Sequence, residues 1–196
     1  MREFGDNARA SKQTNEALDA YLESLEISRK VRKQIDIPDT TVDLIISLIR
    51  TGNVMRELGN DLDAREMYLE GLSIARSLTQ TSTAPYHLCI LLYALVKTAN
   101  VHYALREDAS SNRLAQNAVE VYKMISDHYV DHDDLRDLWY IVALVDERSG
   151  NLDEAKKSIA LSLEYSEVLL KLESTPLSRS IHEDVLSAQE RITSQT

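Results

Sequence analysis

Residues 52–72, GNVMRELGNDLDAREMYLEGL, decide the fold of this 196-residue chain. Apolar residues recur at helical spacing up to Leu58, and Gly59 follows directly. Glycine is the residue that most often closes a helix, because it adopts the left-handed conformation without strain. Asp61 then offers a good N-cap for a second helix with its own apolar face. The stretch therefore predicts two helices joined by a tight turn at Gly59.

Segments similar to this second helix recur along the chain. Small residues anchor four of them at separations of 47, 47 and 44 residues: Ala17, Ala64, Ser111 and Ala155. A further small residue precedes each anchor by twelve positions: Gly5, Gly52, Ala99 and Ala143. One helix pair cannot bury its own apolar face, so the repeat predicts pairs that stack on one another.

Helix boundaries follow from capping signals. We expect these N-caps for the second helix of each pair: Thr14, Asp61, Asp108 and Asn151. Gly150 repeats the turn signal of Gly59, and Pro85 suits the first turn of a helix. The second pair is expected to start at Thr40 or Thr41, after Pro38.

The pattern resembles the tetratricopeptide repeat (TPR) family. Residues 52–72 carry the resemblance, together with Ser149–Ala155 and Trp139 in the preceding helix. The usual TPR unit has about 34 residues, so this chain resembles a long-repeat type found in bacterial multidomain signalling proteins and, more loosely, the light chain of kinesin. The resemblance implies an all-α fold, a right-handed α-solenoid of antiparallel helix pairs.

The resulting organisation is a single TPR-like domain over residues 1–196, with about four repeats and a C-terminal capping helix. Repeat 1, at about 1–37, lacks the start of its first helix. The remaining units are repeat 2 at about 38–82, repeat 3 at about 83–130, repeat 4 at about 131–175 and the cap at about 177–194.

Composition excludes several classes of protein. The chain has 22 Lys and Arg against 32 Asp and Glu, so its formal net charge is −10, which disfavours nucleic acid and anionic membranes. Only 5 Gly and 3 Pro are present, which favours long helices with few connections. The single cysteine, Cys89, lies in an apolar run and is expected to be a buried, inert thiol. The chain begins without an apolar signal region, so we expect a cytoplasmic protein.

Signals for chemistry are weak. The sequence has no glycine-rich phosphate loop, no His-Glu-x-x-His and no cysteine pair, so we expect no enzyme and no cofactor. His128 and His132, four residues apart among aspartates, are the weak candidates for metal ligands. The alternative is a solvated loop between the third and fourth pairs.

The TPR resemblance also implies a binding surface, because in that family the first helix of each pair lines a concave face that holds a peptide or a helix. Carried over position by position, this face contains Arg50, Asn53, Arg56, Tyr93, Lys97, Asn100, Tyr103, Tyr140, Glu147 and Arg148, preceded by Asp6 and Arg9 in the first repeat. Asn53 and Asn100 lie 47 residues apart, as do Arg50 and Lys97. An Asn side chain can pair with a peptide amide, and a neighbouring cation can hold a carboxylate. The alternative is that these are ordinary exposed or inter-repeat residues.

The sequence therefore predicts a protein–protein interaction module or scaffold that holds a peptide, a helix or a partner domain. A self-associating solenoid, and thus a homo-oligomer, is the first alternative. A metal-binding protein using His128 and His132 is the second.

Overall fold

The computed structural model describes residues 2–125, 130–173 and 175–195, with side chains described from residue 13 onward in these ranges. Within them the chain is entirely helical, without a strand. The helices are α1 (Arg2–Gln34), α2 (Pro38–Glu57), α3 (Asp61–Thr81), α4 (Pro85–Ala104), α5 (Asp108–Lys123), α6 (His132–Arg148), α7 (Leu152–Leu172) and α8 (Pro176–Thr193). None of the described helices combines the length and apolarity needed to cross a membrane.

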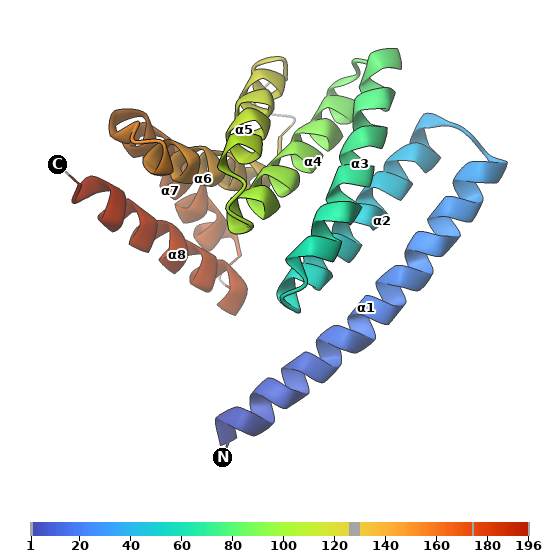
Figure 1. Cartoon of the computed structure of the whole chain (residues 1–196), viewed down its shortest axis with the longest axis horizontal. Helices are drawn as coiled ribbons and strands as arrows, with labels where there is room; N and C mark the ends of the chain where they lie inside the picture. Colours follow the sequence, from blue (N-terminus) through green and yellow to red (C-terminus); the bar gives the residue numbers. More distant parts are fainter. Residues whose placement is uncertain (1, 126–129, 174, 196) are drawn as a thin grey trace.

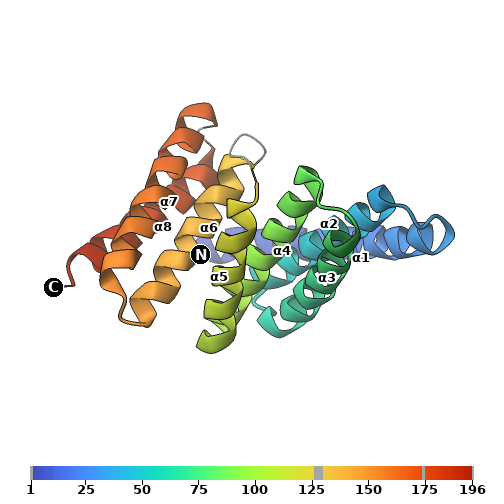
Figure 2. The same ribbon diagram turned by 90° about the horizontal axis from the view of Figure 1, so that it is seen from above.

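The helices stack as a curved α-solenoid (Figures 1 and 2), which confirms the predicted fold class. Each helix packs on the next along the chain. We call α2, α4, α6 and α8 the A helices, and α3, α5 and α7 the B helices. A helices also contact one another from pair to pair, whereas the described B helices do not. The stack therefore curves with the A helices on its inner, concave side.

The turns inside the pairs follow one geometry. Gly59 and Gly150 have positive φ angles of 80° and 83°, as predicted, and Arg106 occupies the same place in the turn between α4 and α5 with φ 62°. In the first of these turns the Gly59 N–H donates to the Arg56 carbonyl at 2.9 Å, and the Asn60 N–H donates to the Met55 carbonyl at 2.9 Å. Both bonds satisfy carbonyls that the helix end would otherwise leave without partners.

The expected turn near Thr14 is wrong. The chain runs through this position as one helix, α1, of 33 residues, so Thr14 is an interior residue and not an N-cap. The residue 47 positions before Gly59 is Lys12, which favours the helical conformation and does not readily adopt a positive φ. The glycine that ends α2 and α6 is therefore absent from this part of α1, although the turn between α4 and α5 forms at Arg106 without one.

Two predicted N-caps lie one residue too late. The caps of α3 and α5 are Asn60 and Glu107, and Asp61 and Asp108 are the first helical residues instead. A carboxylate in the first turn still stabilises the positive end of the helix dipole. The predicted cap Asn151 of α7 is confirmed.

Proline marks the start of three A helices. Pro85 is the first residue of α4, as predicted, whereas α2 begins at Pro38 and not at Thr40 or Thr41. Proline suits this position because its missing N–H has no helical partner to lose. Pro176 opens α8, where Thr175 completes a reciprocal cap: its Oγ1 accepts from the Ser178 N–H at 3.0 Å.

Helix α8 continues the register of the A helices. The A helices begin at residues 38, 85, 132 and 176, so the intervals are 47, 47 and 44. It buries Val185, Ala188 and Ile192 and leaves Glu183 and Glu190 exposed. Exposed polar positions of this kind are typical of a capping helix, and the capping role of α8 stays a prediction.

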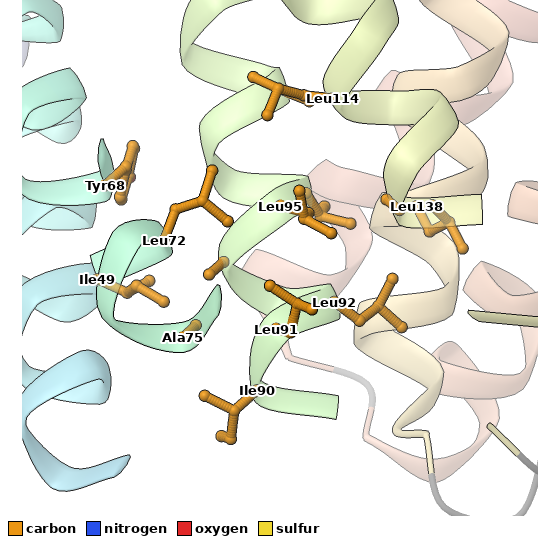
Figure 3. Packing of buried hydrophobic residues seen from close by; sticks show 14 of the residues in the cluster. Ile49, Tyr68, Leu72, Ala75, Ile90, Leu91, Leu92, Leu95, Leu114 and Leu138 are labelled. Carbon is orange, nitrogen blue, oxygen red and sulfur yellow. The ribbon is translucent and has the colours of Figure 1, made fainter. Parts of the chain in front are cut away.

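Close packing of α2 against α3 rests on a missing side chain. Tyr68 of α3, one of the core residues labelled in Figure 3, is completely buried, and a Cβ at position 52 would lie 2.6 Å from its Cε1 atom. Only glycine at position 52 therefore lets the tyrosine ring pack against α2. The corresponding positions of the next repeat hold Ala99 and Ala115, where no aromatic ring needs the space.

We predict that Gly52→Ala destabilises the protein by about 1–3 kcal/mol, because the new methyl group overlaps a buried ring that cannot move away. Urea denaturation followed by circular dichroism measures this change.

Gly71→Ala is the matched control, since a Cβ there meets its nearest neighbour, Cγ1 of Ile49, at an ordinary 3.6 Å. We expect it to be neutral or to stabilise the helix by up to about 1 kcal/mol. Equal unfolding free energies for the two variants would refute the steric explanation.

Candidate functional site

Two adjoining cavities, of about 640 and 540 Å³, lie on the concave side of the stack. We call them the first and the second cavity, and together the groove. They share a central wall formed by Lys97, Arg136, Asp137, Leu177 and Ile181. These residues come from α4, α6 and α8, so the groove is built by successive A helices.

Most of the predicted surface lines this groove. The first cavity includes Asn53, Arg56, Lys97, Asn100 and Tyr140, and the second includes Arg50, Tyr93 and Lys97. Tyr103, Glu147 and Arg148 line neither cavity. The side chains of Asp6 and Arg9 lie outside the described ones.

The two asparagines of the predicted ladder differ. The Tyr68 hydroxyl donates to Oδ1 of Asn53 at 2.7 Å, and Nδ2 of Asn53 lies 3.5 Å from the Tyr93 hydroxyl. Asn100 uses its Nδ2 on the Val96 carbonyl of its own helix at 3.1 Å, and its Oδ1 has no hydrogen bond to a described residue. Position 115, which corresponds to Tyr68, is alanine, so Asn100 lacks the hydroxyl that occupies Asn53. Asn100 therefore keeps an acceptor for a ligand.

A charged network crosses the centre of the groove. Lys97 Nζ lies 2.6 Å from Oδ2 of Asp137, and Arg136 Nη2 lies 2.7 Å from Oδ1 of the same carboxylate. Arg136 also pairs with Asp133 at 2.7 Å. Burial alone would raise the pKa of Asp137, but Lys97 and Arg136 lower it below its usual value. The carboxylate is therefore ionised at neutral pH and holds both cations.

Asp134 is the exception in this network. It lines the second cavity, is largely buried, and has no ion pair or hydrogen bond with a described residue. Burial raises its pKa to about 7; Lys97 opposes this rise, and Asp137, Asp131 and Asp133 add to it. It is thus a carboxyl group without a counterion, beside a pair that has already formed.

The three predicted residues outside the groove hold neighbouring units together. The Arg148 guanidinium stacks over the Tyr103 ring, 3.4 Å from its centroid, and pairs with Asp108. Glu147 accepts two bonds from Arg191 of α8, at 2.8 and 2.7 Å. These side chains are inter-repeat contacts, which was the alternative interpretation of the sequence.

Apart from Tyr140, the sequence did not reveal what α6 and α8 contribute to the groove, which includes Arg136, Asp137, Leu177, Ile181 and Asp184. The sequence nevertheless carries a signal for the charged part of this contribution. Ion pairs between successive units join residues a little less than one repeat apart, such as Lys97 with Asp137, 40 residues on, and Glu147 with Arg191, 44 residues on. A search for opposite charges at that spacing would have found them.

Cys89 differs from its prediction. It is half-buried and lines the second cavity, because the A-helix face that carries it is open to the groove. Burial raises the pKa of its thiol, with Asp134 and Asp131 adding to the rise. The thiol is therefore protonated at neutral pH, the form that is a poor nucleophile.

Two of the five histidines, His102 and His132, have aromatic or acidic neighbours in the structure. His102 is buried and contacts Glu107 through Nδ1. His132 is exposed at the start of α6 and stacks on the Tyr165 ring with centroids 5.9 Å apart. His128, the other candidate metal ligand, lies outside the described residues. Among the residues that are described, no group of three or more His, Cys, Asp or Glu side chains could hold a metal ion.

Comparison with known proteins gives a fold but no family. No protein-family model matches the chain. No curated protein matches it. The crystal structure of BtubC (BKLC) from P. vanneervenii superposes with a TM-score of 0.59 at 12% identity, over 91% of this chain and 74% of that one. The de novo designed helical repeat protein DHR64 gives a TM-score of 0.40 at 16% identity, over 98% and 91% of the two chains. The likeness to BtubC shows a shared fold alone.

We predict that Asp134 makes the stability depend on pH. Its pKa is raised on folding, so between about pH 4 and pH 7 the folded state binds more protons than the unfolded state, and stability falls as pH rises. Asp134→Asn removes this slope, and its advantage over the natural protein should grow to the order of 2–4 kcal/mol by pH 8. Urea denaturation at a series of pH values measures the difference.

Glu164→Gln is the control, because Glu164 is exposed in the interior of α7, away from the N-terminal turn. Its unfolding free energy should track that of the natural protein across the range. Parallel pH curves for Asp134→Asn and the natural protein would show that the carboxyl group titrates normally.

Proposed function

We propose that this chain is a non-enzymatic protein–protein interaction module of the TPR type, a scaffold that holds a peptide, a helix or a partner domain in its groove. The TPR assignment is supported by the motif of residues 52–72 and by helix pairs that recur every 44 to 47 residues. The binding role is supported by the shape and the lining of the concave side.

The observation that carries the proposal is the groove itself. Two cavities that share a wall form one elongated depression along the inner side of the A helices. Its lining combines exposed apolar side chains with polar ones, as interfaces for protein partners commonly do. A chain segment lying along it would meet α2, α4, α6 and α8 in turn.

Two polar side chains of the groove keep hydrogen-bonding groups that a peptide backbone could use. Asn100 offers Oδ1 in the first cavity, and Arg50 is exposed at the second without an ion pair to a described residue. An amide oxygen accepts from a backbone N–H, and a guanidinium donates to a backbone carbonyl. Together these groups can orient an extended segment.

The test is selection from an unbiased peptide library displayed on phage. We expect enriched peptides, and we expect the double variant Arg50→Ala/Asn100→Ala to bind them about ten-fold more weakly, which corresponds to about 1.4 kcal/mol. Fluorescence anisotropy with the enriched peptides measures the affinity, and circular dichroism verifies the fold.

The matched control is Arg113→Ala/Asn117→Ala, which makes the same two changes at exposed positions of the B helix α5. It should bind like the natural protein. A library without enriched peptides, or equal losses in the two double variants, would count against the groove as the binding site.

Self-association is a second candidate, favoured by one flank of α1. Ile27 and Val31 are 54% and 37% exposed, whereas the residues 47 positions later, Ile74 and Leu78, are half-buried and buried in the stack. This flank is a B-type face on which no described helix packs.

If self-association is the function, sedimentation velocity should show a dimer or larger species whose population rises with concentration. Ile27→Asp/Val31→Asp should then shift the population to monomer, because a buried charge opposes the contact. Monomer alone at every concentration would eliminate this candidate.

A further inference from the structure

The cations of the groove are already neutralised by the protein. Lys97 and Arg136 pair with Asp137, and Arg56 pairs with Asp61 at 3.2 Å. Among the described residues that line the groove, Arg50 alone is a cation without an ion pair. An acidic partner would have to draw Lys97 or Arg136 away from a buried carboxylate, and leaving such a group unpaired is costly.

The carboxylates of the groove are in the opposite situation. Asp131, Asp134, Glu57 and Asp184 line it and form no ion pair with a described residue. Asp131 and Asp134 belong to the second cavity, and Glu57 and Asp184 belong to the first. Unpaired negative charge therefore occurs along the full length of the groove.

An apolar wall accompanies these charges. Leu177 is 69% exposed and contributes, with Ile181, to both cavities. Tyr86 is 57% exposed and lines the second cavity beside Tyr93. Exposed leucine and tyrosine next to carboxylates can bury apolar side chains, and the tyrosine rings attract cations.

We infer that the partner of the groove is a basic segment of another protein, in which Lys or Arg side chains flank apolar ones. The inference rests on the proposed function and names the chemistry of its ligand. Charge complementarity selects this occupant, because the groove presents four unpaired carboxylates against one unpaired cation among its described residues. It reverses the expectation from sequence that the groove cations hold a carboxylate.

Asp134 is the residue best placed to meet a partner cation. It faces Lys97, which is committed to Asp137, and the carboxylates of Asp131, Asp133 and Asp137 surround it. A Lys or Arg of the partner would supply the counterion that it lacks. Binding of this cation favours the ionised form of Asp134. The affinity for the basic partner should therefore rise with pH over the range in which Asp134 titrates.

Two pools of synthetic peptides of about ten residues test the inference. One randomises Lys and Leu over its positions, and the other randomises Glu and Leu. At physiological salt we expect the Lys/Leu pool to bind at least about ten-fold more tightly than the Glu/Leu pool. The triple variant Glu57→Gln/Asp134→Asn/Asp184→Asn should lose about ten-fold in affinity for the Lys/Leu pool, and Asp134→Asn alone should abolish the rise with pH.

The control is Asp63→Asn/Asp153→Asn/Glu164→Gln, which makes the same three changes at exposed positions of the B helices. It should bind the Lys/Leu pool as the natural protein does. An equal loss in this control would trace the binding to the overall charge of −10 and overturn the inference.

The remaining outcomes separate the inference from the proposed function. Tighter binding of the Glu/Leu pool, or library peptides that bind the groove without basic residues, would overturn the inference and leave the interaction module standing. Failure of the unbiased library as well as both pools would remove the proposed function itself.

Discussion

Every helix pair in this protein exposes an apolar face that only the next pair can cover, and the rest of the structure depends on this constraint. One continuous core extends from Val42 in α2 to Val145 in α6, through Tyr68, Leu92 and Leu114. Burial of these side chains supplies the main driving force of folding. The chain must therefore place an apolar stripe at the same phase in every repeat, and it does so at intervals of 44 to 47 residues.

The same stacking sets the charge of the groove. Because the A helices approach one another on the concave side, polar side chains of one unit reach the next. Lys97 and Arg136 both meet Asp137 there, and their positive charge is used inside the protein. What remains for a partner is the set of carboxylates without a counterion, Asp134 foremost. The interactions that hold the units together thus also set the charge that the groove presents.

The first and the last helix of the stack, α1 and α8, differ in the side chains that they expose and in their contacts. Helix α8 turns Glu183 and Glu190 outward, and Arg191 clamps it to Glu147 of α6 through two bonds. Helix α1, the first helix in Figure 1, packs mainly on α2 and pairs its Arg29 with Glu70 of α3, while its Ile27 stays exposed. Glu183 and Glu190 are thus exposed polar positions of α8, whereas Ile27 is an exposed apolar position of α1.

Local pattern predicted the helices from α2 onward, the turns at Gly59 and Gly150 and the all-α solenoid, because periodicity and capping are properties of neighbouring residues; it wrongly predicted a break within α1. It also brought seven of the ten predicted surface residues to the groove. It did not reveal that Lys97 is paired, that Asn53 is occupied by Tyr68, or that α8 supplies part of the wall. Those facts depend on distances between side chains some 40 residues apart, which only the packing of one unit against the next establishes.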